Sequence, residues 1–259
     1  GVDKLSIIAK RYGLGSNILK DIYFDEKKGV VPNTKWKKNA IGKSWYLGET
    51  VINGIGQGYI QTTPLQLCLM TAQIANGGYK IKPHILYDKN INFENTKLKI
   101  AKLMNEQLSD NQTAKVSYLE NRKFQLYERL CKNPKNIDFV KDAMFGSTNE
   151  QYGTSYKSRY ENPKYQFAGK TGTSQVKRIT ESERKLDLKQ SEIEYKNRDH
   201  ALYIAFAPYK DPRYSISVLI EHGGSGSKTA APIASKLIKK IIDRHKIREK
   251  TKDANLILA

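Results

Sequence analysis

Two strand-like runs joined by a short turn constrain the fold of this chain more than any other feature. Residues 201–207 (A-L-Y-I-A-F-A) are continuously apolar, and residues 214–220 (Y-S-I-S-V-L-I) are rich in β-branched side chains. Pro208 and Pro212 flank the short connection between them. Because so short a connection cannot cross a sheet, we predict neighbouring antiparallel strands, the first of them central in its sheet.

A helix and a third strand complete the predicted core. From about Thr229 to Arg244 apolar residues recur at helical spacing, and Pro232 suits the first turn. The predicted stripe that packs on the sheet consists of Ile233, Leu237, Ile238, Ile241 and Ile242. Residues 165–176 read as another strand. The pattern indicates an α/β fold of the α+β type, an antiparallel sheet flanked by helices, with a polar tail over residues 246–259.

The segments before residue 150 are predicted to be mainly helices and polar loops. A short first helix has Asp3 as its cap, an apolar stripe of Leu5, Ile8, Ala9 and Tyr12, and Gly13 as its stop. Residues 15–49, with Trp36 and Trp45 among lysines, are expected to form a solvated loop with aromatic anchors rather than a nucleic-acid patch. Residues 88–135 and 177–198 lack a core pattern.

The strongest helix-start signal lies at residues 63–66. Thr63 is a natural N-cap, Pro64 suits the first helical position, and Gln66 can complete a capping box. The helix is predicted to end at the sequence N-G-G of residues 76–78, and its apolar residues on nearly every face predict deep burial. Another helix is predicted from Ile137 to Phe145.

The charge of the chain leaves two classes of partner open. The 45 basic and 26 acidic residues give a net charge of +19. A nucleic-acid binder gathers its cations on one face, whereas here they are spread along the whole chain, so we expect no nucleic-acid partner. A basic module that binds nucleic acid or another anionic polymer is kept as the alternative.

Metal, cofactor and membrane signals are absent from the sequence. The two cysteines and four histidines match no metal-ligand spacing, so we expect no metal site and no cofactor. No run approaches the roughly 20 apolar residues that span a bilayer, and no leader-like segment is present. The chain opens at Gly1 and not at a methionine, so a piece of a longer protein is one of the expectations.

The chemistry is expected around Lys170, Thr171, Gly172 and Thr173. Glycine weakens a strand, and a lysine followed by two threonines is an unusual strand composition unless a ligand lies against the strand edge. Gly172 allows close approach of a ligand, Lys170 and the hydroxyl of Thr173 can hold a carboxylate, and the Thr173 N–H can face an oxyanion. We therefore expect Lys170 to lie beside a groove at the border of the sheet.

The order of several segments resembles the class B penicillin-binding proteins, and within them the elongation-type penicillin-binding protein 2 group. The matching segments are W-Y-L-G-E-T at 45–50, G-I-G-Q-G-Y at 54–59, T-T-P-L-Q at 62–66, N-G-G at 76–78, A-G-K-T-G-T-S-Q-V at 168–176, A-F-A-P-Y at 205–209 and E-H-G-G at 221–224. The resemblance covers about residues 1–245, except 88–135 and 178–199. It implies the C-terminal part of a transpeptidase domain of the β-lactamase-like fold.

That resemblance implies a function and a missing part. The family attacks with the serine of a Ser-x-x-Lys motif and completes its proton network with a Ser-x-Asn motif, and both are expected to precede this chain. We reject, because of their positions in the chain, the Ser-x-x-Lys matches at Ser174, Ser182 and Ser225. We also reject the sequences at 109–111 and 147–149, which resemble the second motif. The chain alone is thus expected to be inactive and, with an uncovered sheet face and edge, poorly soluble.

The roles implied for the matched residues follow the family's third motif. Lys170 and residues 171–173 would bind the terminal carboxylate of a peptidoglycan stem peptide, and the Thr173 N–H would form half of an oxyanion hole. The implied partners are stem peptides, β-lactams, the missing N-terminal part and membrane proteins of the elongation complex. The implied location is the periplasmic face of the bacterial inner membrane, with an anchor outside this chain. An inert remnant of a split gene is the further alternative.

Overall fold

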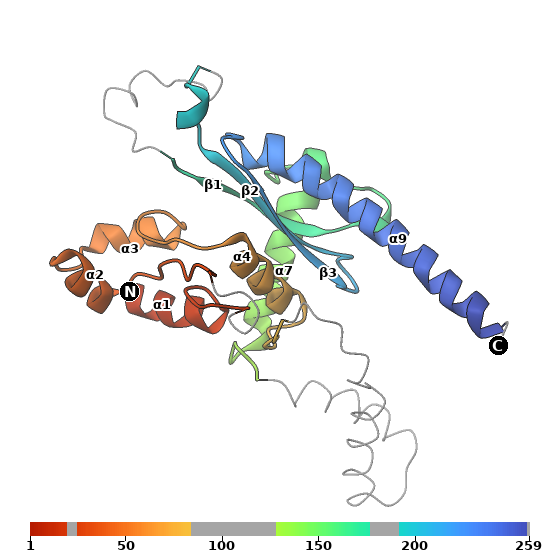
Figure 1. Cartoon of the computed structure of the whole chain (residues 1–259), viewed down its shortest axis with the longest axis horizontal. Helices are drawn as coiled ribbons and strands as arrows, with labels where there is room; N and C mark the ends of the chain where they lie inside the picture. The colour runs from red at the N-terminus through yellow and green to blue at the C-terminus, as the bar shows by residue number, and fades with distance from the viewer. Residues whose placement is uncertain (20–24, 84–127, 177–191, 258–259) are drawn as a thin grey trace, which may run out of the picture.

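A three-stranded antiparallel sheet forms the centre of the fold. The computed structural model describes residues 1–19, 25–83, 128–176 and 192–257 (Figure 1). Strands β1 (Ala168–Ser174), β2 (His200–Ala207) and β3 (Tyr214–Ile220) lie in the order β1-β2-β3, and both pairs are antiparallel. This confirms the predicted pairing across the turn at 208–212. The first strand is shorter than the predicted 165–176, because Pro163–Tyr165 forms a 3-10 turn before it.

Helices cover both faces of this sheet. Helix α9 (Ala231–Ile257) runs along one face, and α4 (Pro64–Ala75) and α7 (Pro134–Asn149) lie against the other (Figure 1). The side chains of β2 alternate between the two: Tyr203 packs with the α9 side, whereas Phe206 packs with Ala75 and Met144. The prediction of an uncovered face is therefore wrong for these three strands. Strand β1 remains an edge of the described sheet.

The predicted stripe of α9 is only partly correct. Ile238 and Ile242 are buried on the sheet, but Ile233 and Leu237 are 39% and 41% exposed. A π-type turn at Gly226–Ala230 precedes the helix. The small side chains of Ala231 and Ala234 face the sheet, so the isoleucine pattern alone misjudged which face is buried. The helix continues to Ile257, beyond the predicted start of the tail.

Helix α4 begins as predicted but buries different side chains. The Thr63 hydroxyl accepts a hydrogen bond from the Gln66 N–H at 3.2 Å, and the Gln66 side chain accepts one from the Thr63 N–H at 3.2 Å. The helix buries Gln66, Thr71 and Gln73, while Leu65 is exposed. The expectation of apolar burial all round is wrong because the amides bind main-chain carbonyls of neighbouring segments.

The N-terminal layer contains more helix than the sequence indicated. Helices α1 (Val2–Arg11), α2 (Thr34–Ile41) and α3 (Leu47–Gly54) form it, so the solvated loop predicted over residues 15–49 is wrong. The predicted cap is also wrong, because the Asp3 carboxylate binds the N–H and hydroxyl of Thr34 and holds the start of α2. Helix α1 buries Val2 and Ser6, whereas Leu5 and Ile8 of the predicted stripe are exposed.

Lys37 explains why the segment around Trp45 folds. Its side chain is buried, and its ammonium forms an ion pair with Glu49 over 2.5 Å. The rings of Trp45, Tyr46 and Tyr59 lie within cation–π range of the same ammonium. Lys37, which we predicted to lie in a solvated loop, thus joins α2 to α3.

The remaining predictions concern the rest of the chain. Helix α7 includes the predicted 137–145 and extends it on both sides. Residues 88–127 and 177–191, with the look-alike motifs at Ser182 and 109–111, lie outside the described residues. Among the helices that the structure describes, none combines the length and the apolar character that crossing a bilayer requires.

Candidate active site

Lys170 and its neighbours lie on the edge strand of the sheet. The Lys170 side chain is exposed, and its ammonium turns back along β1 to the Thr171 carbonyl at 2.8 Å and the Thr171 hydroxyl at 3.3 Å. Residues 171 and 172 are half-buried and Thr173 is exposed. The four predicted site residues therefore form one continuous, accessible stretch of strand. A cavity lies between α1 and α4, but none of residues 170–173 lines it.

The main-chain groups of Thr171 and Thr173 face away from β2. Carbonyls of Phe167, Thr171 and Thr173 accept hydrogen bonds from the side chains of Asn149, Lys170 and Gln57, none of which belongs to β2. In an antiparallel strand the N–H and C=O of one residue point to the same side. The N–H groups of Thr171 and Thr173 therefore point to the open edge too, where they can donate to a ligand.

Gln57 connects a distant segment to this edge. Its side-chain amide donates to the Thr173 carbonyl at 3.0 Å, across 116 residues of sequence. Gln57 belongs to the segment G-I-G-Q-G-Y that follows α3. The resemblance singled out this segment without giving Gln57 a role, so only the fold reveals that it touches the candidate site.

A buried tyrosine supports the strand from behind. Tyr203 is fully buried, and its hydroxyl lies 2.9 Å from the Thr148 hydroxyl and 3.0 Å from that of Ser155. A Cβ built on Gly169 would lie 2.3 Å from the Tyr203 hydroxyl oxygen, so the phenol crosses β1 where a side chain is missing. Burial raises the pKa of Tyr203, which keeps its hydroxyl protonated.

Hydroxyl groups of α7 and of the segment that follows it extend this support to Thr171. The Thr154 hydroxyl lies 3.3 Å from that of Thr171 and 3.3 Å from that of Ser147. The neighbouring Asn149 amide binds the carbonyls of Phe145 and Phe167. The look-alike motif at 147–149 therefore anchors α7 to β1, and its hydrogen bonds describe a structural role.

The glycine loop after β3 packs against the same strand. A Cβ on Gly226 would lie 2.7 Å from the Gly172 carbonyl oxygen and 2.6 Å from that of Leu202. Two glycines thus meet where this loop crosses the candidate site. Ser225, which begins a Ser-x-x-Lys match, caps the following turn through the Lys228 N–H and lies 3.0 Å from the Ser227 hydroxyl. Ser174 is the exposed last residue of β1.

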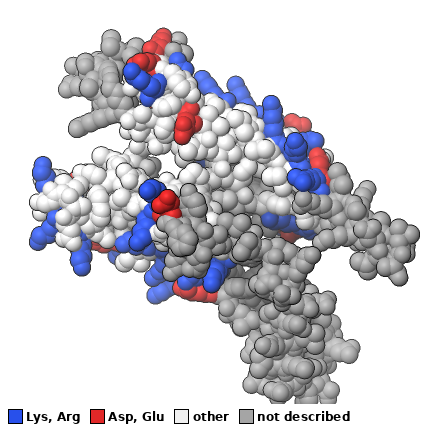
Figure 2. All heavy atoms as spheres, viewed as in Figure 1, with Lys and Arg blue, Asp and Glu red and all other residues white. Residues whose placement is uncertain are grey.

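The charge distribution matches the predicted scatter on the visible face. Figure 2 shows Lys and Arg side chains over α9, over the N-terminal helices and around the lower centre of the molecule, with acidic side chains between them. Within the described ranges, no group of three or more histidine, cysteine or acidic side chains is arranged to hold a metal ion.

Comparison with known proteins identifies the family. The family described as the penicillin binding protein transpeptidase domain matches residues 1–239. The chain belongs to this family. The peptidoglycan D,D-transpeptidase MrdA of Salmonella typhimurium is 32% identical over 251 residues, and that of Escherichia coli is 29% identical over 243 residues. These relatives confirm the penicillin-binding protein resemblance and its transpeptidase-like fold.

Solved structures of family members agree with this assignment. PBP2 of Helicobacter pylori, solved in complex with MreC, superposes with a TM-score of 0.68 at 28% identity, and covers 94% of this chain. PBP2 of Pseudomonas aeruginosa, solved in complex with WCK 5153, has a TM-score of 0.64 at 30% identity over 92% of the chain. Both are PBP2 proteins, as the resemblance to the penicillin-binding protein 2 group predicted.

The chain corresponds to a minor part of each relative. It spans 35% of the Salmonella transpeptidase, 33% of the E. coli one, and 36% and 42% of the two solved chains. What those whole proteins bind and catalyse is therefore a property of longer molecules than the one described here.

Proposed function

We propose that this chain supplies the Lys-Thr-Gly wall of a D,D-transpeptidase that cross-links peptidoglycan stem peptides. The observation that carries the proposal is the open edge of β1, where the Lys170 ammonium lies 3.3 Å from the Thr171 hydroxyl and the Thr173 carbonyl faces away from β2, with the N–H of Thr173 on the same side. A cation with hydroxyl and N–H donors is the arrangement that holds a carboxylate beside a developing oxyanion.

The proposed reaction has two steps. A serine hydroxyl outside this chain attacks the carbonyl of the penultimate D-Ala, and the terminal D-Ala leaves with a proton on its amine. A neighbouring stem amine then attacks the ester, forms the cross-linking amide and returns the proton to the serine. Lys170 and residues 171–173 hold the terminal carboxylate, and the Thr173 N–H donates to the oxyanion in both steps.

The whole protein's partners and location belong to the same proposal. Stem peptides are the substrates, and β-lactams acylate the same serine. An N-terminal part supplies the Ser-x-x-Lys helix and the membrane anchor, and holds the enzyme at the periplasmic face of the inner membrane. Membrane proteins of the elongation complex are the assembly partners, in line with the H. pylori PBP2 that was solved with MreC.

Labelling with a fluorescent penicillin tests the proposal. We expect no covalent label on the 259-residue chain alone, and denaturation-resistant label when the preceding Ser-x-x-Lys segment is joined to it. In that longer protein Lys170→Ala should slow labelling about a hundredfold, whereas the exposed control Lys210→Ala should not change it. Label on the chain alone would show that its nucleophile is present after all, and equal labelling of both variants would remove Lys170 from the site.

A further inference from the structure

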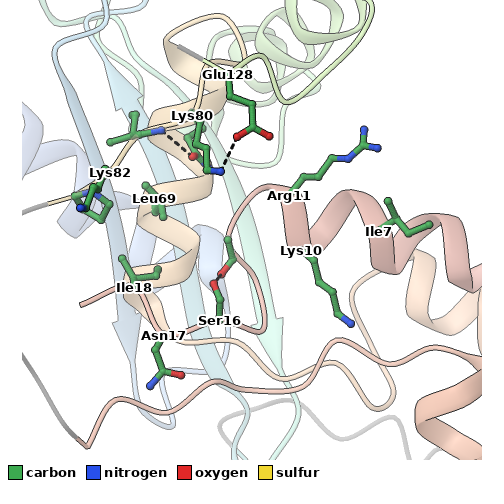
Figure 3. Close-up of a pocket in the computed structure, with 14 residues that line it drawn as sticks. Ile7, Lys10, Arg11, Ser16, Asn17, Ile18, Leu69, Lys80, Lys82 and Glu128 are labelled. Carbon is green, nitrogen blue, oxygen red and sulfur yellow. Dashed lines mark hydrogen bonds and ion pairs between the residues drawn. The ribbon is translucent and has the colours of Figure 1, made fainter. Parts of the chain in front are cut away.

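A groove between α1 and α4 has the features of a second binding site. Its volume is about 800 Å³, and it lies between the C-terminal half of α1, one face of α4 and the segment at 80–83 (Figure 3). Its lining includes Ile18, Leu69 of α4 and Ile7 of α1. No residue of the Lys170 strand contributes to it.

One buried amide, that of Gln73, contacts three of the segments that line the groove. Gln73 of α4 is 2% exposed, and its Nε2 donates to the Tyr12 carbonyl at the end of α1 over 2.9 Å. Its Oε1 accepts a hydrogen bond from the Ile81 N–H over 3.0 Å. The end of α1, helix α4 and the segment at Ile81 are thus joined by a single side chain. The groove exists before any ligand arrives, which lowers the entropic cost of binding.

The charge of the groove is strongly positive. Among its described lining residues, Lys10, Arg11, Lys80 and Lys82 carry positive charge, and Glu128 alone carries a carboxylate. That carboxylate pairs with Lys80 over 2.6 Å. In the described parts of the chain, Lys10, Arg11 and Lys82 have no ion-pair partner. Figure 3 shows Lys10 and Arg11 extending from α1, with Lys80 and Lys82 on the other side of the groove.

The apolar part of the lining restricts the kind of anion. Ile7 is 53% exposed, and Ile18, Leu69 and Ile81 are half-buried around the same space. A free phosphate would leave these side chains in water. A ligand that carries both carboxylates and a large apolar group would cover them and neutralise the cations.

We propose that this groove binds an acidic segment of a partner protein, in which carboxylates flank a large apolar side chain. Its carboxylates pair with Lys10, Arg11 and Lys82, and its apolar side chain lies against Leu69 and Ile7. A nucleic acid is disfavoured because none of the described lining residues is aromatic, so bases have no stacking surface. A membrane surface is disfavoured because a bilayer contacts protruding residues, whereas this lining is concave.

The binding of designed peptides to the 259-residue chain tests the proposal. The probe is a fluorescein-labelled peptide that repeats Glu-Leu-Glu-Gly, and the comparison peptides replace either Glu by Gln or Leu by Ser. Fluorescence anisotropy should show saturable binding of the first peptide, weakened by salt, and at least about tenfold weaker binding of both comparison peptides. Circular dichroism checks that each protein variant is folded.

Variants of the protein locate the site. Lys10→Gln combined with Arg11→Gln should weaken binding about fivefold to tenfold, and Ile7→Ser about threefold. The control, Lys236→Gln combined with Lys240→Gln, removes the same charge from the exposed face of α9 and should leave affinity unchanged. An equal loss of peptide affinity in both double variants would show that binding depends only on the net charge of the protein, which would contradict a site in this groove. The assignment would be overturned if the Gln peptide bound as tightly as the Glu peptide. It would also be overturned if phosphatidylglycerol vesicles or single-stranded DNA bound more tightly than the Glu peptide and lost affinity in the Lys10 and Arg11 double variant.

Discussion

The side-chain amide of Gln57 donates a hydrogen bond to the main-chain carbonyl of Thr173 over 3.0 Å. The N-terminal layer and the edge strand are therefore joined at the residue whose N–H is proposed to bind the oxyanion. A change in Gln57 should move that N–H without touching Lys170.

Gln57→Glu tests this link. A carboxylate cannot donate to the Thr173 carbonyl, and it adds a negative charge beside the proposed oxyanion site. In the longer protein that carries the nucleophile, we expect the rate of penicillin acylation to fall about tenfold. Gln61→Glu, an exposed glutamine of the same region, is the matched control. Equal rates for Gln57→Glu and the unmodified protein would show that this hydrogen bond does not position Thr173.

Gly169→Ala should destabilise the fold. Its new Cβ would lie 2.3 Å from the Tyr203 hydroxyl oxygen, and Tyr203 is fully buried, so the strand or the ring must shift. We expect a loss of about 2–3 kcal/mol in the free energy of unfolding by urea. Gly48→Ala meets no neighbouring atom in α3 and should stabilise by about 0.5 kcal/mol. A neutral Gly169→Ala would mean that Tyr203 does not cross the strand there.

Tyr203→Phe removes a hydroxyl that forms hydrogen bonds with two other hydroxyl groups. Thr148 and Ser155 each lose a buried partner, so we expect a loss of about 1–2 kcal/mol. Tyr152→Phe, at a side chain that is 96% exposed, should be neutral. If Tyr203→Phe matched that control, the hydroxyl would not hold α7 to the strand.

Alkaline unfolding gives a second measure of Tyr203. Its pKa is raised by burial, so in the folded protein it keeps its proton at pH values where the unfolded chain has lost it. Its contribution is fully present below about pH 10, the ordinary tyrosine pKa, and is lost as pH rises above it. Tyr203→Phe should therefore flatten the fall in stability above about pH 10 in a series of urea titrations. An unchanged alkaline slope would contradict this.

Lys37→Met should show that a buried lysine contributes more to stability than an exposed lysine. The substitution removes the ammonium that pairs with Glu49 and so breaks the contact between α2 and α3, at a cost of roughly 2 kcal/mol. Lys38→Met, one residue away and exposed, should change stability by less than about 0.5 kcal/mol. Equal effects of the two would show that the cation contributes no more than any surface lysine.

Acid titration reports on the same ion pair. Hydrogen bonds from Lys37 and from the Tyr46 N–H hold the pKa of Glu49 below its ordinary value. The stabilisation is therefore present above about pH 4.3, the ordinary glutamate pKa, and disappears as pH falls below it. The acid limb of the stability curve should be shallower in Lys37→Met than in Lys38→Met, as measured by thermal unfolding at a series of pH values.

The sequence predicted the sheet better than the N-terminal layer, and the reason is physical. Strands β2 and β3 are continuous apolar runs joined by a proline-bounded turn, so local pattern and final burial agree. In contrast, Lys37, Gln66 and Gln73 are buried because of partners far along the chain. A pattern that counts polar residues as exposed cannot anticipate such partners.

The candidate site likewise contains residues that the sequence could predict and residues that it could not. Lys170 to Thr173 could be singled out because the composition of that strand is unusual, and the structure places these residues together on an accessible edge. Gln57, Asn149 and Tyr203 carried no local signal of their relation to it. Each reaches the strand from another element, and the register that aligns Tyr203 with Thr171 follows from tertiary packing.

The outward carbonyls of β1 have a consequence for any extended peptide that arrives there. Because Gln57 and Lys170 already occupy two of them, an incoming strand must exchange hydrogen bonds instead of simply adding new ones. The gain in free energy is then the difference between two bonded states, which is small for an arbitrary peptide. A peptide that also offers an anion to the released Lys170 ammonium would bind more tightly than one that does not. The hydrogen bonds of Gln57 and Lys170 in the free protein would therefore favour binding of carboxylate-bearing peptides over other extended peptides.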